Sequence, residues 1–181
     1  MIEVEAKIQI QDPSEYREKI KHLSNLKFKE KKIDDYYTLE SLKGYPQKSL
    51  RIRKHEKFYE INFKQRISYI NGIHAKNEEE FRVTNLPHFL DLIKDFGFKQ
   101  WLRKEKVSEI YEIRKNFHIE INYVKYLGWF LEIERLCYSK KQVANARRNI
   151  LKIIKKLGID KKDIVKEGYT KMLCAKKKLG A

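Results

Sequence analysis

The chain has 181 residues and carries 41 lysines and arginines against 25 aspartates and glutamates, a formal net charge of +16 at pH 7. Hydrophobic residues make up 41% and aromatic residues 12%, which excludes a disordered chain. No apolar run approaches the roughly 20 residues of a membrane span. The excess of positive charge predicts a polyanionic partner: nucleic acid, an anionic membrane surface or a phosphate-rich small molecule.

This length suits a single domain that covers residues 1–181. The N-terminus shows no basic-then-apolar leader, which is typical of an intracellular protein. Cys137 and Cys174 lie far apart in the sequence and lack the spacing of a zinc site. We therefore predict a cytoplasmic protein with two free thiols.

Residues 2–10 alternate between apolar and charged side chains, the pattern of a β-strand. Within the stretch EVEAK, Glu3, Glu5 and Lys7 lie on one face of that strand, and apolar residues lie on the other face. The ionic face could meet solvent, as in many antiparallel sheets, or a polar interior. This strand alone does not decide between the two arrangements.

A helix is predicted after this strand, because Asp12 can cap it and Pro13 suits its first turn. Three strands follow in the stretches KFKEKKIDDYYTL, SLRIRK and FYEINFKQ. The dipeptide Asn71-Gly72 then predicts a tight hairpin turn.

The order of elements repeats after this hairpin. The stretch EEEFRV predicts a strand, and the helix that follows opens near Pro87 and buries a stripe made of Phe89, Leu90, Ile93 and Phe96. The strands VSEIYEI, FHIEINYV and WFLEIERL complete this second set.

Two similar halves, about 1–75 and about 76–157, therefore make up most of the chain. Their shared order predicts a mainly antiparallel sheet that closes on itself and encloses an interior. A last helix is predicted after Ser139, and a basic C-terminal segment covers 158–181.

The alternation seen in the first strand recurs in the other predicted strands, so one whole face of the sheet is ionic. In a closed sheet these charges point outward around an apolar core or inward around a wet tunnel. Helices with apolar stripes need an apolar surface to cover, which favours the inward arrangement. A divalent metal and a phosphorylated ligand could then compensate the mixed charges. No glycine-rich phosphate loop is present, so side chains would bind the phosphate.

The stretch EVEAK resembles the ExExK signature of the CYTH superfamily, the triphosphate tunnel metalloenzymes that include class IV adenylyl cyclases and thiamine triphosphatases. The similarity continues in order through LRIR, NFK, the paired glutamates of NEEEFRV, LGWFLEIE and GYTKML, and so spans nearly the whole chain. The resemblance implies an α+β fold, in which a closed antiparallel eight-stranded β-barrel forms a tunnel with the charges inside and helices packed outside.

The resemblance also implies the residues of the site. Mg²⁺ or Mn²⁺ would be held by three glutamates: Glu3, Glu5 and Glu132. The triphosphate would be bound by five basic residues: Lys7, Arg51, Arg53, Lys64 and Lys106. The catalytic residues among these would be Lys7, Glu5 and Lys64. Further tunnel candidates are Glu78, Glu80, Glu134 and Asn122.

Two positions depart from the pattern of the family. Ser108 stands in KVSEIY where related cyclases often have arginine, and Asn122 stands where many members have aspartate. Asparagine can donate or accept a hydrogen bond but supplies no negative charge. These departures bear on substrate choice and rate more than on the fold.

The resemblance implies a metal-dependent enzyme that acts on ATP, inorganic triphosphate or thiamine triphosphate. LGWFLEIE and KVSEIY favour the class IV adenylyl cyclase reaction, from ATP to cyclic AMP and pyrophosphate. Hydrolysis of an organic or inorganic triphosphate is the alternative. A second alternative is a non-catalytic protein that binds RNA or another polyanion through Arg147, Arg148 and the C-terminal lysines. We predict no membrane partner, and a homodimer is possible. The five histidines are expected to be structural or surface residues.

Overall fold

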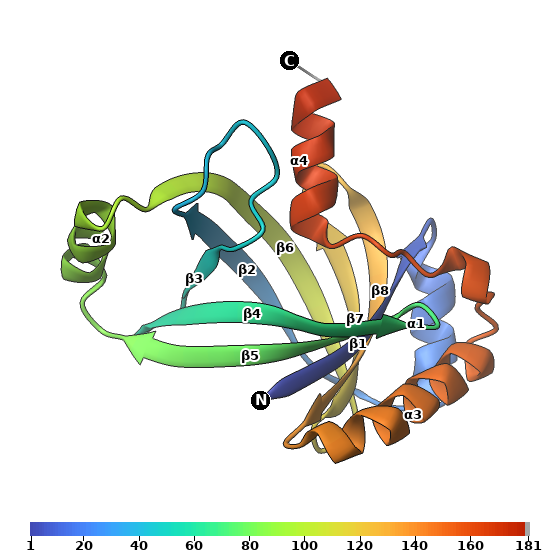
Figure 1. Ribbon diagram of the computed structural model, residues 1–181. Helices are drawn as coiled ribbons and strands as arrows, with labels where there is room; N and C mark the ends of the chain where they lie inside the picture. The colour runs from blue at the N-terminus through green and yellow to red at the C-terminus, as the bar shows by residue number, and fades with distance from the viewer. Residues whose placement is uncertain (180–181) are drawn as a thin grey trace.

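Eight antiparallel strands close into a barrel in the order β1-β5-β4-β3-β2-β6-β7-β8, as the sequence predicted (Figure 1). The structure is a computed structural model that describes residues 1–179. The predicted basic segment 158–181 therefore extends two residues beyond the described ones. The strands are β1 (Ile2–Ile10), β2 (Leu26–Thr38), β3 (Leu50–Lys54), β4 (Tyr59–Ile70), β5 (Ile73–Val83), β6 (Lys99–Arg114), β7 (Phe117–Val124) and β8 (Gly128–Cys137).

Helices pack around the outside of the barrel (Figure 1). The helices are α1 (Pro13–Lys21), α2 (Leu86–Asp95), α3 (Val143–Lys156) and α4 (Tyr169–Leu179), with short 3-10 turns at Lys140–Gln142 and Lys161–Asp163. Among the described residues, no helix combines the length and the apolar character needed to cross a membrane.

The main apolar core lies outside the barrel wall, between the strands and α1 and α3. Val4, Ala6 and Ile8 of β1 point outward into this core, where they belong to one buried cluster with Ala146 and Ile150 of α3. Because strand side chains alternate, this outward packing turns Glu3, Glu5 and Lys7 inward. The inward arrangement of charges is therefore confirmed, and the helices cover the apolar face that this arrangement creates.

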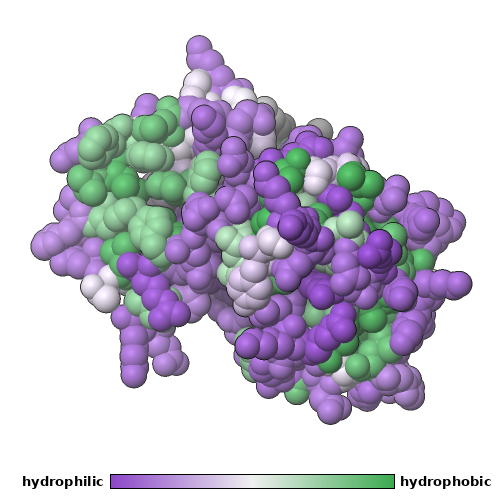
Figure 2. Space-filling view, turned by 60° about the horizontal axis from the view of Figure 1, so that its bottom comes forward, coloured by the Kyte–Doolittle hydropathy of each residue, from purple (hydrophilic) through white to green (hydrophobic). Residues whose placement is uncertain are grey.

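A second apolar cluster lies under α2, where Ile93 packs with Ile52 and Ile61. Phe89 and Leu90 join this cluster, but Phe96 is 71% exposed, contrary to the prediction. The reason is local: α2 ends at Asp95, and Phe96 caps it before the chain turns. Figure 2 shows a mostly hydrophilic face on which hydrophobic residues gather at the side where α2 lies.

The predicted hairpin turn at Asn71-Gly72 joins β4 and β5. Both residues have positive φ, 53° and 80°, which suits the tight turn that asparagine and glycine favour. A Cβ atom added to Gly72 would lie 2.9 Å from Cγ2 of Ile164. The turn therefore needs glycine both for its backbone conformation and for the close approach of the 159–165 segment.

We expect Gly72→Ala to lower the free energy of unfolding by at least about 1–2 kcal/mol, because alanine resists the left-handed conformation. Gly44→Ala is the matched control, since its Cβ would meet nothing within 4 Å and its φ is not positive. Urea denaturation of both variants measures the difference. Equal stability of the two variants would contradict this account of the turn.

Candidate functional site

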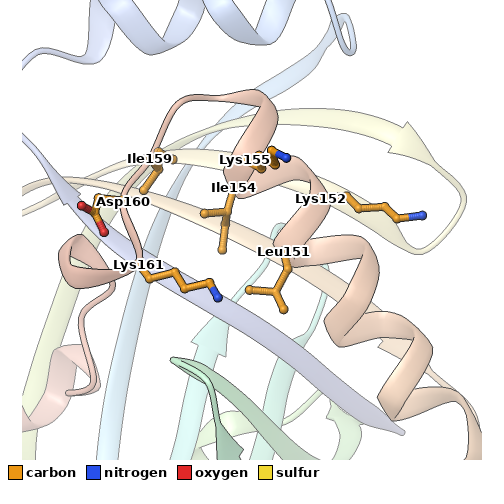
Figure 3. A pocket seen from close by; sticks show the side chains of 7 residues that line it. All are labelled: Leu151, Lys152, Ile154, Lys155, Ile159, Asp160 and Lys161. Carbon is orange, nitrogen blue, oxygen red and sulfur yellow. The ribbon is translucent and has the colours of Figure 1, made fainter.

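The barrel encloses a cavity of about 450 Å³ that is lined mainly by charged side chains. Another hollow of about 490 Å³ lies outside the barrel, beside α3, and its apolar floor is bordered by three lysines and one aspartate (Figure 3). Only the barrel cavity gathers both signs of charge in number, with nine lysines and arginines against six glutamates. The basic residues are Lys7, Lys32, Arg51, Arg53, Lys64, Arg66, Lys76, Lys104 and Lys106, and the glutamates are Glu3, Glu5, Glu78, Glu120, Glu132 and Glu134.

The first strand supplies one row of this lining. Nζ of Lys64 donates a hydrogen bond of 2.8 Å to Oε2 of Glu3, and Lys76 pairs with Glu5. Nζ of Lys7 lies 3.1 Å from Oε1 of Glu132, which is its register partner on β8. Each of the three carboxylates predicted to hold a metal thus lies beside at least one lysine.

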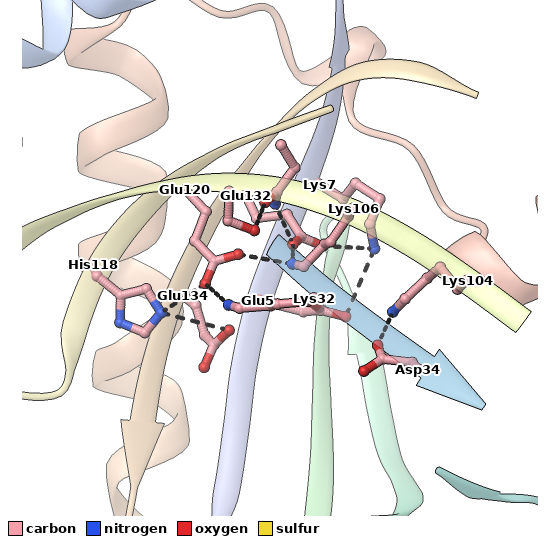
Figure 4. Close-up of polar contacts among 12 residues, drawn as sticks. Glu5, Lys7, Lys32, Asp34, Lys104, Lys106, His118, Glu120, Glu132 and Glu134 are labelled. Atoms are coloured by element: carbon pink, nitrogen blue, oxygen red, sulfur yellow. Dashed lines mark hydrogen bonds and ion pairs between the residues drawn. The ribbon is translucent and has the colours of Figure 1, made fainter. Parts of the chain in front are cut away.

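A second row runs across β6, β7 and β2 (Figure 4). Nζ of Lys106 donates to Oε2 of Glu120 at 2.8 Å and to Oε2 of Glu132 at 3.3 Å. Lys32 approaches the same Glu120 from β2, with Nζ 3.3 Å from Oε1. The predicted triphosphate ligand Lys106 is therefore held between two buried carboxylates.

The arginines of β3 lie at one side of the cavity. Arg53 forms a bidentate pair with Asp34, with Nε to Oδ1 at 2.7 Å and Nη2 to Oδ2 at 3.0 Å. Nζ of Lys104 lies 2.9 Å from Oδ2 of the same aspartate. Arg51 pairs with Glu60. These contacts fix the two guanidinium groups before any ligand arrives.

Burial and neighbouring charges divide the glutamates into two groups. Burial opposes ionisation of Glu5 and Glu120, but the lysines beside them hold both pKa values well below the usual range. Burial raises the pKa of Glu3 despite Lys64, with Glu5 and Glu78 adding repulsion. Burial and the nearby Glu3 likewise raise the pKa of Glu134. Glu3 and Glu134 are therefore the carboxylates that an added cation would stabilise most.

The donor chemistry fits a hard divalent cation, since the buried Glu3 and the partly buried Glu134 offer carboxylate oxygens with incompletely compensated charge. Within residues 1–179, however, no three His, Cys, Asp or Glu side chains are already placed to hold one ion together. The lysine contacts of Glu3, Glu5 and Glu132 account for this. A bound cation would share these carboxylates with the lysines or displace them.

A comparison with known protein families identifies the family of this chain, because the CYTH domain matches residues 1–169. The chain belongs to the CYTH family. A protein of Methanocaldococcus jannaschii described as a "putative adenylate cyclase" is 27% identical over 175 residues, 95% of this chain and 98% of that protein.

Solved structures show the same fold. The PH1819 protein of Pyrococcus horikoshii has a TM-score of 0.80 at 25% identity, covering 96% of this chain and 99% of that one. The HpAC1 protein of Hippeastrum has a TM-score of 0.62 at 17% identity, covering 97% and 96%. That plant protein is described as a "putative adenylyl cyclase" with a dominant triphosphatase activity.

Most of the predicted site residues of this CYTH chain line one cavity. The lining includes Glu3, Glu5, Lys7, Arg51, Arg53, Lys64, Lys106 and Glu132, together with the further candidates Glu78 and Glu134. Glu80 is exposed and does not line the cavity, and Asn122 is fully buried behind the lining.

Several lining residues were missed from the sequence: Lys32, Lys76, His118, Glu120 and Tyr169. Alternation could have found Lys32 and Glu120, because Lys32 and Asp34 share one face of β2, and His118, Glu120 and Asn122 share one face of β7. His118 and His74 also line the cavity, and Nε2 of His74 bonds to the carbonyl oxygen of Lys166 at 2.8 Å. Nε2 of His118 lies 3.7 Å from Oε2 of Glu134.

The two departures from the CYTH pattern lie opposite each other in the β6–β7 register. Oγ of Ser108 donates to Oδ1 of Asn122 at 2.6 Å, and Nδ2 of Asn122 donates to Oε2 of Glu132 at 2.7 Å. A neutral hydrogen-bonded pair therefore occupies these two positions and orients the Glu132 carboxylate.

We expect Asn122→Asp to lower the free energy of unfolding by roughly 2 kcal/mol, because a buried donor to Glu132 becomes a like charge. The exposed Asn25→Asp change is the matched control. Adding Ser108→Arg to Asn122→Asp should recover part of the loss, since the register then permits an ion pair. Chemical denaturation measures all four chains, and an Asn122→Asp variant as stable as the control would contradict the assigned role.

Proposed function

We propose that this CYTH protein is a metal-dependent enzyme that binds the triphosphate of its substrate inside the barrel. The conversion of ATP to cyclic AMP and pyrophosphate is the first candidate reaction. The observation that carries the proposal is the gathering of nine basic residues and six glutamates on the wall of one cavity. A polyphosphate would pair with the basic residues, and a divalent cation with the glutamates, in a setting shielded from bulk water.

The arginines and the lysines would contact the phosphate groups in different ways. Arg51 and Arg53 present planar guanidinium groups that suit bidentate contacts with phosphate oxygens. Lys7, Lys64 and Lys106 provide point charges. Burial opposes the charge of Lys64 and Lys106, but the carboxylates beside them raise both pKa values and keep them protonated. Because these groups are already positioned, little reorganisation would accompany charge development in a transition state.

Mg²⁺ or Mn²⁺ is the proposed cofactor, held by Glu3, Glu5 and Glu132 with Glu134 as a further ligand. When bound, such an ion neutralises phosphate charge and orients the leaving group. The raised pKa values of Glu3 and Glu134 support this assignment, because they mark carboxylates that lack full compensation. Lys7 of β1 and Lys64 of β4, two strands separated by β5, would hold the phosphates near these carboxylates.

Two reactions fit the same binding site. In a cyclase, the ribose 3′-hydroxyl attacks the α-phosphorus and pyrophosphate leaves. In a hydrolase, water attacks the terminal phosphorus of ATP, inorganic triphosphate or thiamine triphosphate. The name of the Methanocaldococcus jannaschii relative supports the cyclase proposal. The activity described for the Hippeastrum protein of the same fold keeps hydrolysis as the second candidate.

Binding of RNA or another polyanion outside the barrel is the remaining alternative. Arg148 is exposed on α3, but Arg147 is partly buried and donates to Oγ of Ser68 at 2.6 Å. This contact removes one of the two arginines on which the alternative relied. Steeply salt-dependent RNA binding that survives Glu3→Gln would support it.

Turnover of ATP, inorganic triphosphate and thiamine triphosphate with Mg²⁺ or Mn²⁺ tests the proposal, with cyclic AMP, pyrophosphate and orthophosphate resolved. We expect Glu5→Gln and Lys106→Met each to lower kcat/KM by about 100-fold or more. Glu112→Gln, an exposed change on β6, is the control. A chelator should abolish turnover.

Cyclic AMP with pyrophosphate would identify the cyclase, and orthophosphate alone the hydrolase. Full activity of Glu5→Gln, or turnover that a chelator leaves unchanged, would contradict the proposal.

A further inference from the structure

The first residue of α4, Tyr169, lies against the charged cavity although it comes from the last helix of the chain. Its side chain is buried, with 6% of the residue exposed, and its ring meets Phe130 edge to face at 5.0 Å. The other side of the ring faces the lysines. The ammonium groups of Lys7, Lys104 and Lys106 lie 4.2, 5.6 and 6.0 Å from the ring centroid.

The hydroxyl of Tyr169 is buried, and its proton has no acceptor among the described residues. Tyr169 is one of the residues that line the cavity. The Asn122 amide is a neighbour that can donate its second N–H to the phenol oxygen, but its Oδ1 already accepts from Ser108 and so does not take the hydroxyl proton.

A buried hydroxyl without a partner is costly, by about 1–3 kcal/mol. Such a group in a charged cavity is explained if a ligand supplies the missing acceptor. The acceptor must be anionic to be held beside three ammonium groups. A cation or an apolar group would meet repulsion from the lysines or leave the hydroxyl unpaired.

We propose that the Tyr169 hydroxyl donates a hydrogen bond to an oxygen of the phosphate chain bound by Lys7, Lys104 and Lys106. This inference rests on the proposed function and makes α4 part of the binding site. Tyr169 is then a binding residue contributed from outside the barrel. The neighbouring Thr170 shares a hydrogen bond of 2.9 Å with Tyr45 of the β2–β3 loop, so the same helix also closes over one side of the cavity.

The Tyr169→Phe variant separates binding from folding, because it keeps the ring and its contacts with the lysines and removes only the hydroxyl. We expect the dissociation constant for inorganic triphosphate, measured by calorimetry with the full chain, to rise about tenfold. The free energy of unfolding without ligand should stay the same or increase, because an unpaired buried group is lost. Tyr123→Phe, at a tyrosine that is 43% exposed, is the matched control and should change neither quantity.

The possible results are distinct. Weaker binding with unchanged or higher stability supports the proposal. Equal binding by wild type and Tyr169→Phe overturns it while the proposed function stands. Loss of stability together with binding overturns it as well, because the hydroxyl then serves the fold. A wild-type protein that binds no triphosphate overturns both the proposed function and this inference.

Discussion

Charges inside a closed barrel must be neutralised by neighbours, because water cannot reach them freely and unpaired buried charge is prohibitively costly. This constraint governs the whole molecule. It requires carboxylates and ammonium groups to alternate across the lining, as Lys106 does between Glu120 and Glu132. It also turns most apolar residues of the strands outward, where α1, α2 and α3 cover many of them. The fold and the site are therefore consequences of one alternating pattern.

The charges inside the barrel are not fully neutralised by one another, which favours the binding of a charged ligand. Glu5 and Glu120 are compensated by lysines, whereas Glu3 and Glu134 keep raised pKa values. The lining as a whole nevertheless carries more cations than carboxylates. A polyphosphate together with a divalent cation satisfies both imbalances at once. Neither an isolated metal nor an isolated anion does so as fully.

The sequence predicted what depends on local pattern and on order. The closed barrel and most of its lining were predicted from three features: the alternation in EVEAK, the Asn71-Gly72 turn and the family resemblance. What the sequence could not supply depends on contacts between distant segments. The place of Tyr169 beside Lys7 follows from how α4 returns to the barrel, and no local spacing encodes that return.

The errors have equally physical causes. The helical spacing placed Phe96 on a buried stripe, but Phe96 is the C-cap at the end of α2 and is exposed, and Phe98 beyond it joins the apolar cluster. Glu80 lies on the same face of β5 as Glu78, yet it is exposed, because the pairing of β5 with β1 ends at Asn77 and leaves Glu80 paired only with β4. The alternation of side chains along a strand sets the face on which a residue lies, but it does not set which neighbouring strands surround that residue. Ser108 and Asn122 looked like two separate losses of charge, and only the register shows them to be one pair.

The measurement that tests the central claim most directly is a crystal structure of the protein with inorganic triphosphate and Mg²⁺. The account predicts one phosphate chain inside the barrel, in contact with Arg51, Arg53 and Lys106, with the cation on the side of Glu3 and Glu5. Phosphate bound only on the outer face of α3, with no ligand in the barrel, would contradict it.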